Sequence, residues 1–215
     1  MALTAPLPRA PSDPLGDPVA HWYAHVLGWP VAGGPPVQLL TGVCFDVLEM
    51  PSDAGFAVLR RGIATGPVAV LGRRMRMLVA AGAADELAGL LDWLEWGGVA
   101  LDLTATGAGG RITAPLPPTG APGRSPGVPG RAGEVREGAG DTEVPETRQG
   151  AAVWLRPPEA GCEARLPAMT ALGRPPGAGT PAGAPDLVRL VGAAATECHR
   201  ARLLRTRSNQ ALAFS

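Results

Sequence analysis

Short apolar runs, separated by turns rich in glycine and proline, dominate the pattern of this chain. Their length and their content of valine, leucine and isoleucine are typical of buried strands. We expect strands over residues 43–48, 67–71, 75–80, 99–103, 111–114 and 152–156. Two of these runs contain one aspartate each, Asp46 and Asp102. Because an unpaired buried carboxylate is strongly destabilising, we expect the two aspartates to share a polar site.

A different periodicity marks the helices. Residues 17–27 begin with an Asp-Pro pair that is typical of a helix start, and Gly28 is typical of a helix end. Ser52 is a plausible start for a second, short helix. Apolar residues recur at helical spacing over residues 84–96 and again in a last helix over residues 186–206. Strands mixed with helices predict an α+β fold.

The amino-acid composition indicates that the folded part of the protein is shorter than the whole chain. The 215 residues include 30 glycines and 24 prolines, and these gather in segments with few large apolar side chains. Such segments bury too little surface to offset their ordering entropy. We therefore expect a disordered N-terminal tail (1–16), a disordered insert (117–150) and a linker (169–185). One domain (17–168) would contain the insert, and the helix over 186–206 would pack on it.

Charge and cysteine content exclude several classes of protein. The chain has 19 basic and 19 acidic residues, so it lacks the overall positive charge of a dedicated nucleic-acid-binding protein. All the basic residues are arginine, which codon bias explains. Its three cysteines form no CxxC pair, so neither a disulfide framework nor a zinc site is indicated. No apolar run is long enough to span a membrane, and we expect a soluble cytoplasmic protein without a membrane partner.

Several motifs, taken in order, resemble one known family. They are the segments WYAHVLGWP (22–30), GRRMRML (72–78) and WLRPP (154–158), together with the strands that hold Asp46 and Asp102. In this order they resemble the N-terminal domain of bifunctional DNA primase/polymerases (Prim-Pol), of the archaeo-eukaryotic primase superfamily. The resemblance implies an α+β core with a mixed or antiparallel RRM-like sheet and flanking helices.

The resemblance also implies a catalytic site with two divalent metal ions. In the family, an Asp-x-Asp pair on one strand and a third aspartate on another hold Mg²⁺ or Mn²⁺, and a histidine contacts the nucleotide phosphates. Two metal ions activate the attacking hydroxyl group and stabilise the leaving group. Several carboxylates are needed because these ions prefer hard oxygen ligands.

This chain matches that site only in part. By the resemblance, Asp46 is the first catalytic and metal-binding carboxylate and Asp102 is the third. Leu48 occupies the second position, and Met75 stands where the histidine is expected. Glu49 comes one residue too late, so a regular strand would point it to the opposite face, and only a bulge could bring it back. We therefore expect the catalytic activity to be lost, with no cofactor bound.

Phosphate contacts are a second hypothesis for the same region. Arg73, Arg74 and Arg76 surround the position of the missing histidine, and Gly109 and Gly110 form a turn near Asp102. Arginine clusters and glycine turns both suit phosphate groups. More ordinary interpretations are a solvated hairpin tip and a plain turn, just as Asp46 could cap a turn or pair with an arginine.

The sequence leaves three hypotheses of function open. In the first, the chain is a catalytically inactive Prim-Pol-like domain that binds a nucleotide, a nucleic acid or a protein. In the second, it is an active metal-dependent nucleotidyltransferase that uses Asp46, Glu49 and Asp102 with Mg²⁺ or Mn²⁺, which requires these carboxylates to converge. In the third, it is a protein–protein adaptor that uses its C-terminal helix or the insert, and exposed Leu187, Leu190 and Val191 would favour it.

Overall fold

The computed structural model describes residues 16–119, 151–169 and 185–211. The tail, insert and linker that the sequence predicts to be disordered lie outside these ranges, apart from their outermost residues. The strands are β1 (Val31–Ala32), β2 (Gln38–Leu40), β3 (Asp46–Pro51), β4 (Val68–Leu71), β5 (Arg74–Val79), β6 (Thr104–Thr106), β7 (Arg111–Thr113) and β8 (Val153–Arg156). The helices are α1 (Pro18–His21), the π-helix η2 (Trp22–Leu27), α2 (Ser52–Arg60), α3 (Ala83–Trp93), the 3₁₀-helix η3 (Cys162–Arg165) and α4 (Leu187–Ala211). The predicted α+β class is confirmed.

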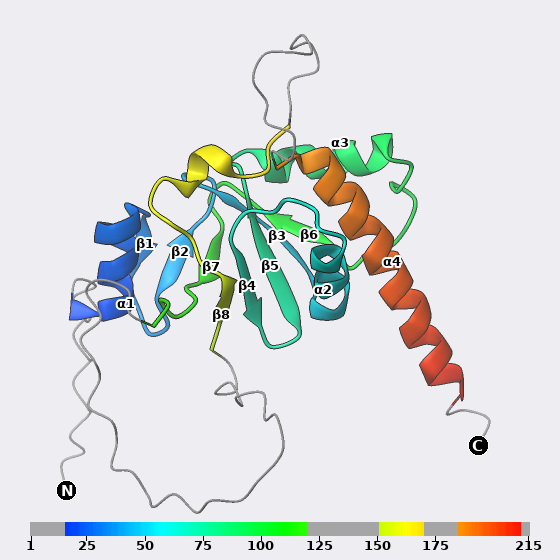
Figure 1. Ribbon diagram of the computed structural model, residues 1–215, viewed down its shortest axis with the longest axis horizontal. Coiled ribbons are helices and arrows are strands. Elements are labelled where there is room, and N and C mark those ends of the chain that lie inside the picture. The colour runs from blue at the N-terminus through cyan, green and yellow to red at the C-terminus, as the bar shows by residue number, and fades with distance from the viewer. Residues whose placement is uncertain (1–15, 120–150, 170–184, 212–215) are drawn as a thin grey trace, which may run out of the picture.

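An antiparallel five-stranded sheet forms the centre of the molecule. Its strand order is β6-β3-β5-β4-β8, so β3 and β5 lie in the middle. A smaller antiparallel sheet, β1-β2-β7, lies beside it together with α1 and η2. Figure 1 shows this smaller part at one end of the molecule and α2 and α4 at the other.

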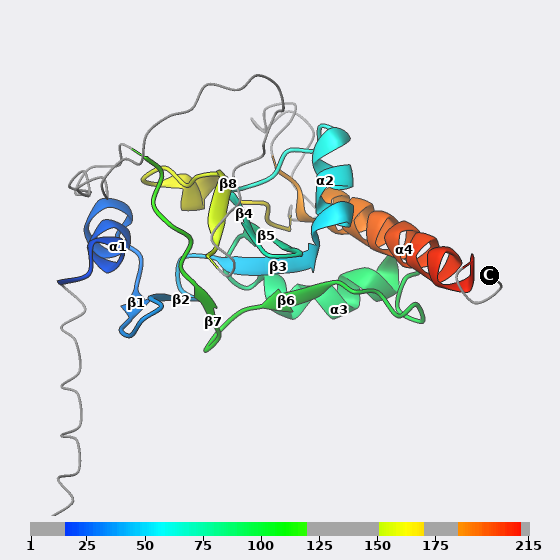
Figure 2. The same cartoon turned by 90° about the horizontal axis from the view of Figure 1, so that it is seen from below.

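The helices α2, α3 and α4 cover one face of the five-stranded sheet, which we call the helix face (Figure 2). On β3, Leu48 and Met50 point to this face, and opposite them on β5 lie Met77 and Met75. All four side chains are almost completely buried. Gly55 of α2 lies so close to Met75 that a Cβ atom there would overlap it, so the small residue sets the close approach of α2 to the sheet.

A second core lies between the five-stranded sheet and the smaller sheet. It contains the aromatic pair Trp29 and Phe45, whose ring centroids are 4.6 Å apart. The hydroxyl group of Tyr23 donates a hydrogen bond to the carbonyl oxygen of Pro115 (2.8 Å) and accepts one from the indole of Trp154 (2.8 Å). Tyr23 therefore connects the N-terminal helix to segments on both sides of residues 120–150.

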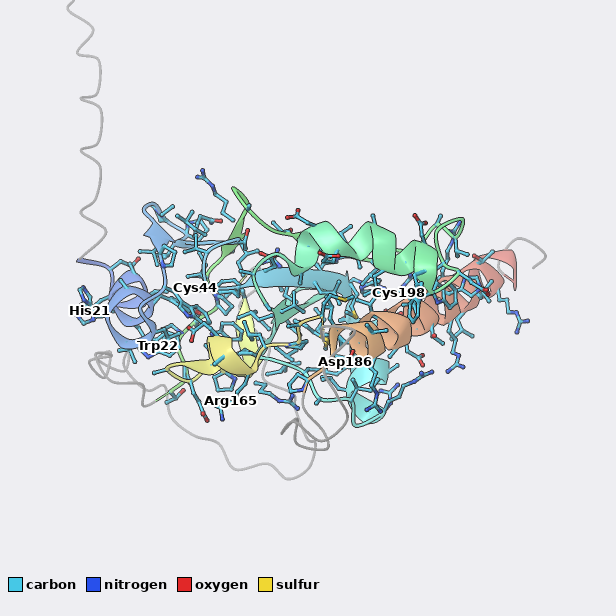
Figure 3. All side chains as sticks on the ribbon, turned by 90° about the horizontal axis from the view of Figure 1, so that it is seen from above. His21, Trp22, Cys44, Arg165, Asp186 and Cys198 are labelled. Atoms are coloured by element: carbon cyan, nitrogen blue, oxygen red, sulfur yellow. The ribbon has the colours of Figure 1, made fainter. Side chains whose placement is uncertain are left out.

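The last helix is present where the sequence predicts it but continues five residues further, to Ala211, and the apolar stripe of its first half is buried inside the molecule. Leu187, Leu190 and Val191 are at most 2% exposed, because they pack in the helix-face core. Cys198, which Figure 3 labels on the same helix, is completely buried, and its thiol donates to the carbonyl oxygen of Asp102 at 3.8 Å. The exposed stripe that would favour an adaptor is therefore absent at these positions.

One predicted strand is wrong. Residues 99–103, including Asp102, form a loop, and the pairing with β3 begins only at Thr104. Leu101 and Leu103 explain the error, because they pack against the helix-face core from a loop without joining the sheet. An apolar run predicts burial more reliably than it predicts a strand.

Candidate functional site

The middle strands of the sheet place charged residues on the face opposite the helices, which we call the open face. Glu49 on β3 lies opposite Arg76 on β5, and Pro51 lies opposite Arg74. Successive side chains of a strand point to opposite faces, so Glu49, Arg74 and Arg76 are on one side while Leu48 and the methionines are on the other. The alternating sequence Arg-Met-Arg-Met in β5 produces this separation of charge from apolar surface.

Glu49 binds both arginines through the same nitrogen atom of each guanidinium group. The Nε of Arg74 donates to Oε1 of Glu49 at 2.9 Å, and the Nε of Arg76 donates to Oε2 at 2.6 Å. Arg74 also donates through Nη1 to Oδ1 of Asp102 at 2.6 Å. The three side chains Glu49, Arg74 and Arg76 are 22%, 28% and 14% exposed, so solvent screens these contacts only in part. We call Glu49, Arg74, Arg76 and Asp102 the Glu49 cluster.

Mutual contacts within the Glu49 cluster favour the charged forms of Glu49 and Arg74. Burial alone would raise the pKa of Glu49, but the hydrogen bonds and charges of Arg76 and Arg74 outweigh it and hold the pKa below its usual value. For Arg74, burial acts to lower the pKa, and the contacts with Asp102 and Glu49 outweigh it and raise the pKa. The arrangement therefore presents two permanent cations, each held by a carboxylate.

The outer nitrogen atoms of the two arginines differ in their partners, since Nη1 of Arg74 binds Asp102 whereas those of Arg76 have no described acceptor. Because Glu49 takes the two Nε atoms, neither Nη atom of Arg76 donates a hydrogen bond to any described residue. The Nη1 of Arg76 is buried and lacks an acceptor there. An unsatisfied buried donor is destabilising by about 1–3 kcal/mol, so an anionic oxygen that reached this atom would be bound favourably. Paired, oriented guanidinium groups suit phosphate and carboxylate ligands.

The surroundings of the Glu49 cluster form one row across the sheet. The row runs through one residue of each strand: Thr104, Glu49, Arg76, Ala69 and Trp154. Ala69 is the smallest member, and it separates a guanidinium group from an indole ring. The row is not an open platform, because Ala69 is 1% exposed and the indole of Trp154 packs against the second core and donates to the hydroxyl group of Tyr23.

Asp46 lies on the helix face of the sheet, apart from the Glu49 cluster. Its side chain is 1% exposed and points to the helix face, where Oδ2 accepts a hydrogen bond from the backbone nitrogen of Ala84 at 2.9 Å. Gly82, the residue that precedes α3, has a positive φ of 90° and no side chain that could cap the helix. Asp46, on β3, therefore caps α3, and its carboxylate interacts favourably with the positive end of the helix dipole.

The predicted convergence of Asp46, Glu49 and Asp102 does not occur. The register between β3 and its neighbours β5 and β6 is continuous, with no bulge to turn Glu49 toward Asp46. Asp102 joins Glu49 only through Arg74, at the surface of the molecule. The expectation that Asp46 and Asp102 share one polar site is wrong, because the N-terminus of α3 supplies the partner of Asp46 and an arginine supplies that of Asp102.

The remaining predicted phosphate contacts are divided between two places. Arg73 is exposed at the turn between β4 and β5, next to the Glu49 cluster. Gly109 and Gly110 instead form a turn that packs against Thr41, whose hydroxyl group donates to the carbonyl oxygen of Gly107 at 2.6 Å. The backbone nitrogen of Gly110 already donates to the same oxygen. The glycine turn thus buttresses the loop beside Asp46.

The residues of the expected metal site do not fit a pair of divalent ions. Both oxygen atoms of Glu49 accept from guanidinium groups, and Asp102 accepts from Arg74. Asp46 has a single oxygen atom, Oδ1, without a partner. Within the described ranges no three histidine, cysteine or acidic side chains come together in a way that could hold a metal ion. All three cysteines are free thiols.

Comparisons with known proteins do not assign the chain to a family. No protein-family model, no curated protein and no solved structure matches the chain. In the part of the chain that the structure describes, no helix is both long enough and apolar enough to cross a membrane. The function must therefore be argued from the sheet and its arginines.

Sequence reasoning missed the pairing within the Glu49 cluster. Glu49, Arg74 and Arg76 were each singled out, but as a displaced metal ligand and as free phosphate contacts. The alternation of arginine and methionine in residues 74–77, beside a strand with one outward glutamate, is the signal that would have paired them.

Proposed function

We propose that this chain is a Prim-Pol-like domain without polymerase activity, and that it binds the phosphate groups of a nucleotide or a nucleic-acid strand on the open face of its sheet. The single observation that carries this proposal is the way in which Glu49 holds Arg74 and Arg76. It takes the inner Nε donor of each, so that among the outer donors only Nη1 of Arg74 has a described partner, the half-exposed Asp102. Oriented cations lose little entropy when an anion binds.

Arg74 and Arg76 have different roles in the proposed phosphate binding. Arg76 is the more buried, and its Nη1 lacks an acceptor, so a phosphate oxygen binds it favourably once neighbouring side chains shift to expose this atom. Arg74 is held by two carboxylates and supplies a second cation beside it. Because Asp102 is half exposed, a competing anion can displace it from Arg74. Arg73, at the adjacent turn, extends the positive surface toward a longer strand.

The loss of polymerase activity rests on the helix face. Leu48 and Met75, at positions where the family has an aspartate and a histidine, are buried in the apolar core. Asp46 is engaged in capping α3. No group in this arrangement activates a 3′-hydroxyl group, so binding is the activity that these side chains support.

The test is a binding titration with two kinds of ligand. A fluorescent single-stranded oligonucleotide and a fluorescent nucleoside triphosphate are each titrated with the wild-type protein and with Arg74→Ala and Arg76→Ala. We expect each substitution to weaken binding of one of these ligands about tenfold, which corresponds to about 1.4 kcal/mol. For the oligonucleotide, each lost phosphate contact should reduce the salt slope by about 0.7.

The matched control is Arg165→Ala, which removes an exposed arginine from η3, away from the Glu49 cluster. It should leave both affinities unchanged. If neither ligand binds the wild-type protein, or if Arg165→Ala weakens binding as much as Arg76→Ala does, the proposal is wrong. Binding of the triphosphate alone identifies a nucleotide site, whereas binding of the oligonucleotide alone identifies a nucleic-acid surface.

A further inference from the structure

An apolar groove lies between α3 and the start of α4, away from the Glu49 cluster. Its volume is about 440 Å³, and Leu90 and Val188 lie in its lining. Two large apolar side chains at this groove face solvent: Trp93 is 70% exposed and Met169 is 40% exposed. An exposed tryptophan beside an apolar hollow is typical of the centre of a protein–protein contact.

The groove has an acidic border. Residues 77–110, which include all of α3, contain five acidic residues and no basic one. Glu86 is two helical turns from Trp93 on the same face of α3, and it lines the groove together with Asp186. Arg189 also lines the groove, where its backbone nitrogen binds the carboxylate of Asp186. Two carboxylates and one guanidinium group thus line the groove, and their net negative charge suits an apolar side chain flanked by positive charge.

The other end of α4 has the complementary character. Its buried stripe ends at Ala201, and beyond it Leu203 and Leu204 are 51% and 58% exposed. Four arginines flank these leucines in the sequence; Arg200 binds Glu197, Arg202 binds the carbonyl oxygen of Ala100 and Arg205 binds Asp53, so Arg207 is the cation that the contact proposed below uses. Leu203 and Arg207 are four residues apart and share one face of the helix. Figures 1 and 2 show this end of α4 projecting beyond the rest of the molecule.

One copy of the chain cannot bring these two surfaces together. The groove includes Arg189, near the start of α4, and the basic end is at Arg207 of the same helix. Eighteen residues of α-helix separate them, which is about 27 Å at 1.5 Å per residue. In Figure 3, Asp186 marks the groove end of the helix, far from the projecting end. Any contact between the two surfaces must therefore join different molecules.

We propose that the Leu203–Arg207 end of α4 in one copy docks into the α3–α4 groove of a second copy. Leu203 enters the apolar hollow beside Trp93 and Met169, and Arg207 faces the carboxylates of Glu86 and Asp186. Such a contact is heterologous, because it joins two different surfaces, so it produces either a closed ring or a longer chain of subunits. It does not depend on the phosphate-binding function proposed above.

The experiment measures self-association of the full chain by analytical ultracentrifugation over a series of concentrations. We expect the wild-type protein to associate reversibly, and high salt to weaken the association because the charges at the rim are screened. Trp93→Ala and Leu203→Asp should each weaken it about tenfold or more. Phe56→Ala, which truncates an exposed aromatic side chain on α2, and Arg165→Glu, which reverses an exposed charge on η3, are the matched controls. Both should associate as the wild type does.

A mixture of the two defective variants gives the sharpest result. Trp93→Ala has an intact helix end, and Leu203→Asp has an intact groove, so an equimolar mixture should form a one-to-one complex that neither variant forms alone. Circular dichroism of each variant verifies that it is folded. A wild-type protein that stays monomeric at its highest soluble concentration would overturn the proposal. So would a folded Trp93→Ala variant that associates normally, or a mixture that forms no complex.

Discussion

Asp46 and Glu49 are two acidic residues on the same strand, and they do entirely different work on the two faces of the sheet. On the helix face, Asp46 is buried and binds the backbone at the start of α3. On the open face, Glu49 is partly exposed and binds two arginines. The comparison teaches that the side of a strand, more than the residue type, decides whether a carboxylate supports the fold or organises a site.

The two faces of the sheet also separate the positions that were compared with the catalytic site of the Prim-Pol family from the charged residues that could bind a ligand. Leu48 and Met75, which the proposed resemblance aligns with a metal ligand and a phosphate-binding histidine, lie on the helix face with Asp46. The charged side chains that could bind an anion lie on the other face. The helix face is therefore predicted to respond to mutation through stability, and the open face through binding.

The largest expected effect is that of Leu48→Asp, which creates an Asp-x-Asp pair with Asp46. We expect this substitution to lower the free energy of unfolding by at least about 4 kcal/mol, because it places an unpaired carboxylate in the helix-face core. Urea denaturation followed by circular dichroism measures it. Leu48→Met is the control of similar volume and should cost less than about 1.5 kcal/mol. A folded Leu48→Asp protein that made primers with Mg²⁺ would contradict this division of the sheet.

A smaller loss of stability is expected for Asp46→Ala. It removes the cap of α3 and should lower the free energy of unfolding by about 1–2 kcal/mol. Asp46→Asn keeps an oxygen acceptor for the backbone nitrogen of Ala84 and should lower it less. Neither change should alter ligand affinity in the binding titration. A folded Asp46→Asn protein with the stability of the wild type and no ligand binding would place Asp46 in the site after all.

The smallest expected effect is a pH dependence due to Glu49. Its pKa is lower in the folded protein than in the unfolded chain, so the contribution of Glu49 to stability is complete above the unfolded value of about 4.3. It is lost as the pH falls through the lower, folded value. Thermal unfolding of the wild type and of Glu49→Gln, from neutral to acidic pH, measures this contribution. The difference in Tm should be constant near neutral pH and should shrink only in acid.

A difference in Tm that grew as the solution became more acidic would show that the pKa of Glu49 is raised in the folded protein. Such a result would mean that burial outweighs the two arginines. It would remove the electrostatic basis of the Glu49 cluster.

The sequence predicted most of the fold and less of the site. Apolar periodicity located β5 and α4 because both bury a continuous face. The alternation of side chains along a strand also predicted correctly that Glu49 and Asp46 point to opposite faces of β3, since this alternation is a local property. The partner of Asp46 could not be predicted, because the start of α3 is far along the chain and only the fold brings it near. The strand over 99–103 was wrong for a related reason, since leucines in a loop can be as buried as those in a strand.

The most direct test of the account is the affinity of Glu49→Gln for the phosphate-bearing ligand in the binding titration. This substitution makes the open face more positive but weakens the hold on Arg74 and Arg76. If Glu49 acts by orienting these arginines, binding should become weaker by about threefold to tenfold despite the added positive charge. Binding that stays the same or becomes tighter would contradict the account, because net charge alone would then explain the affinity.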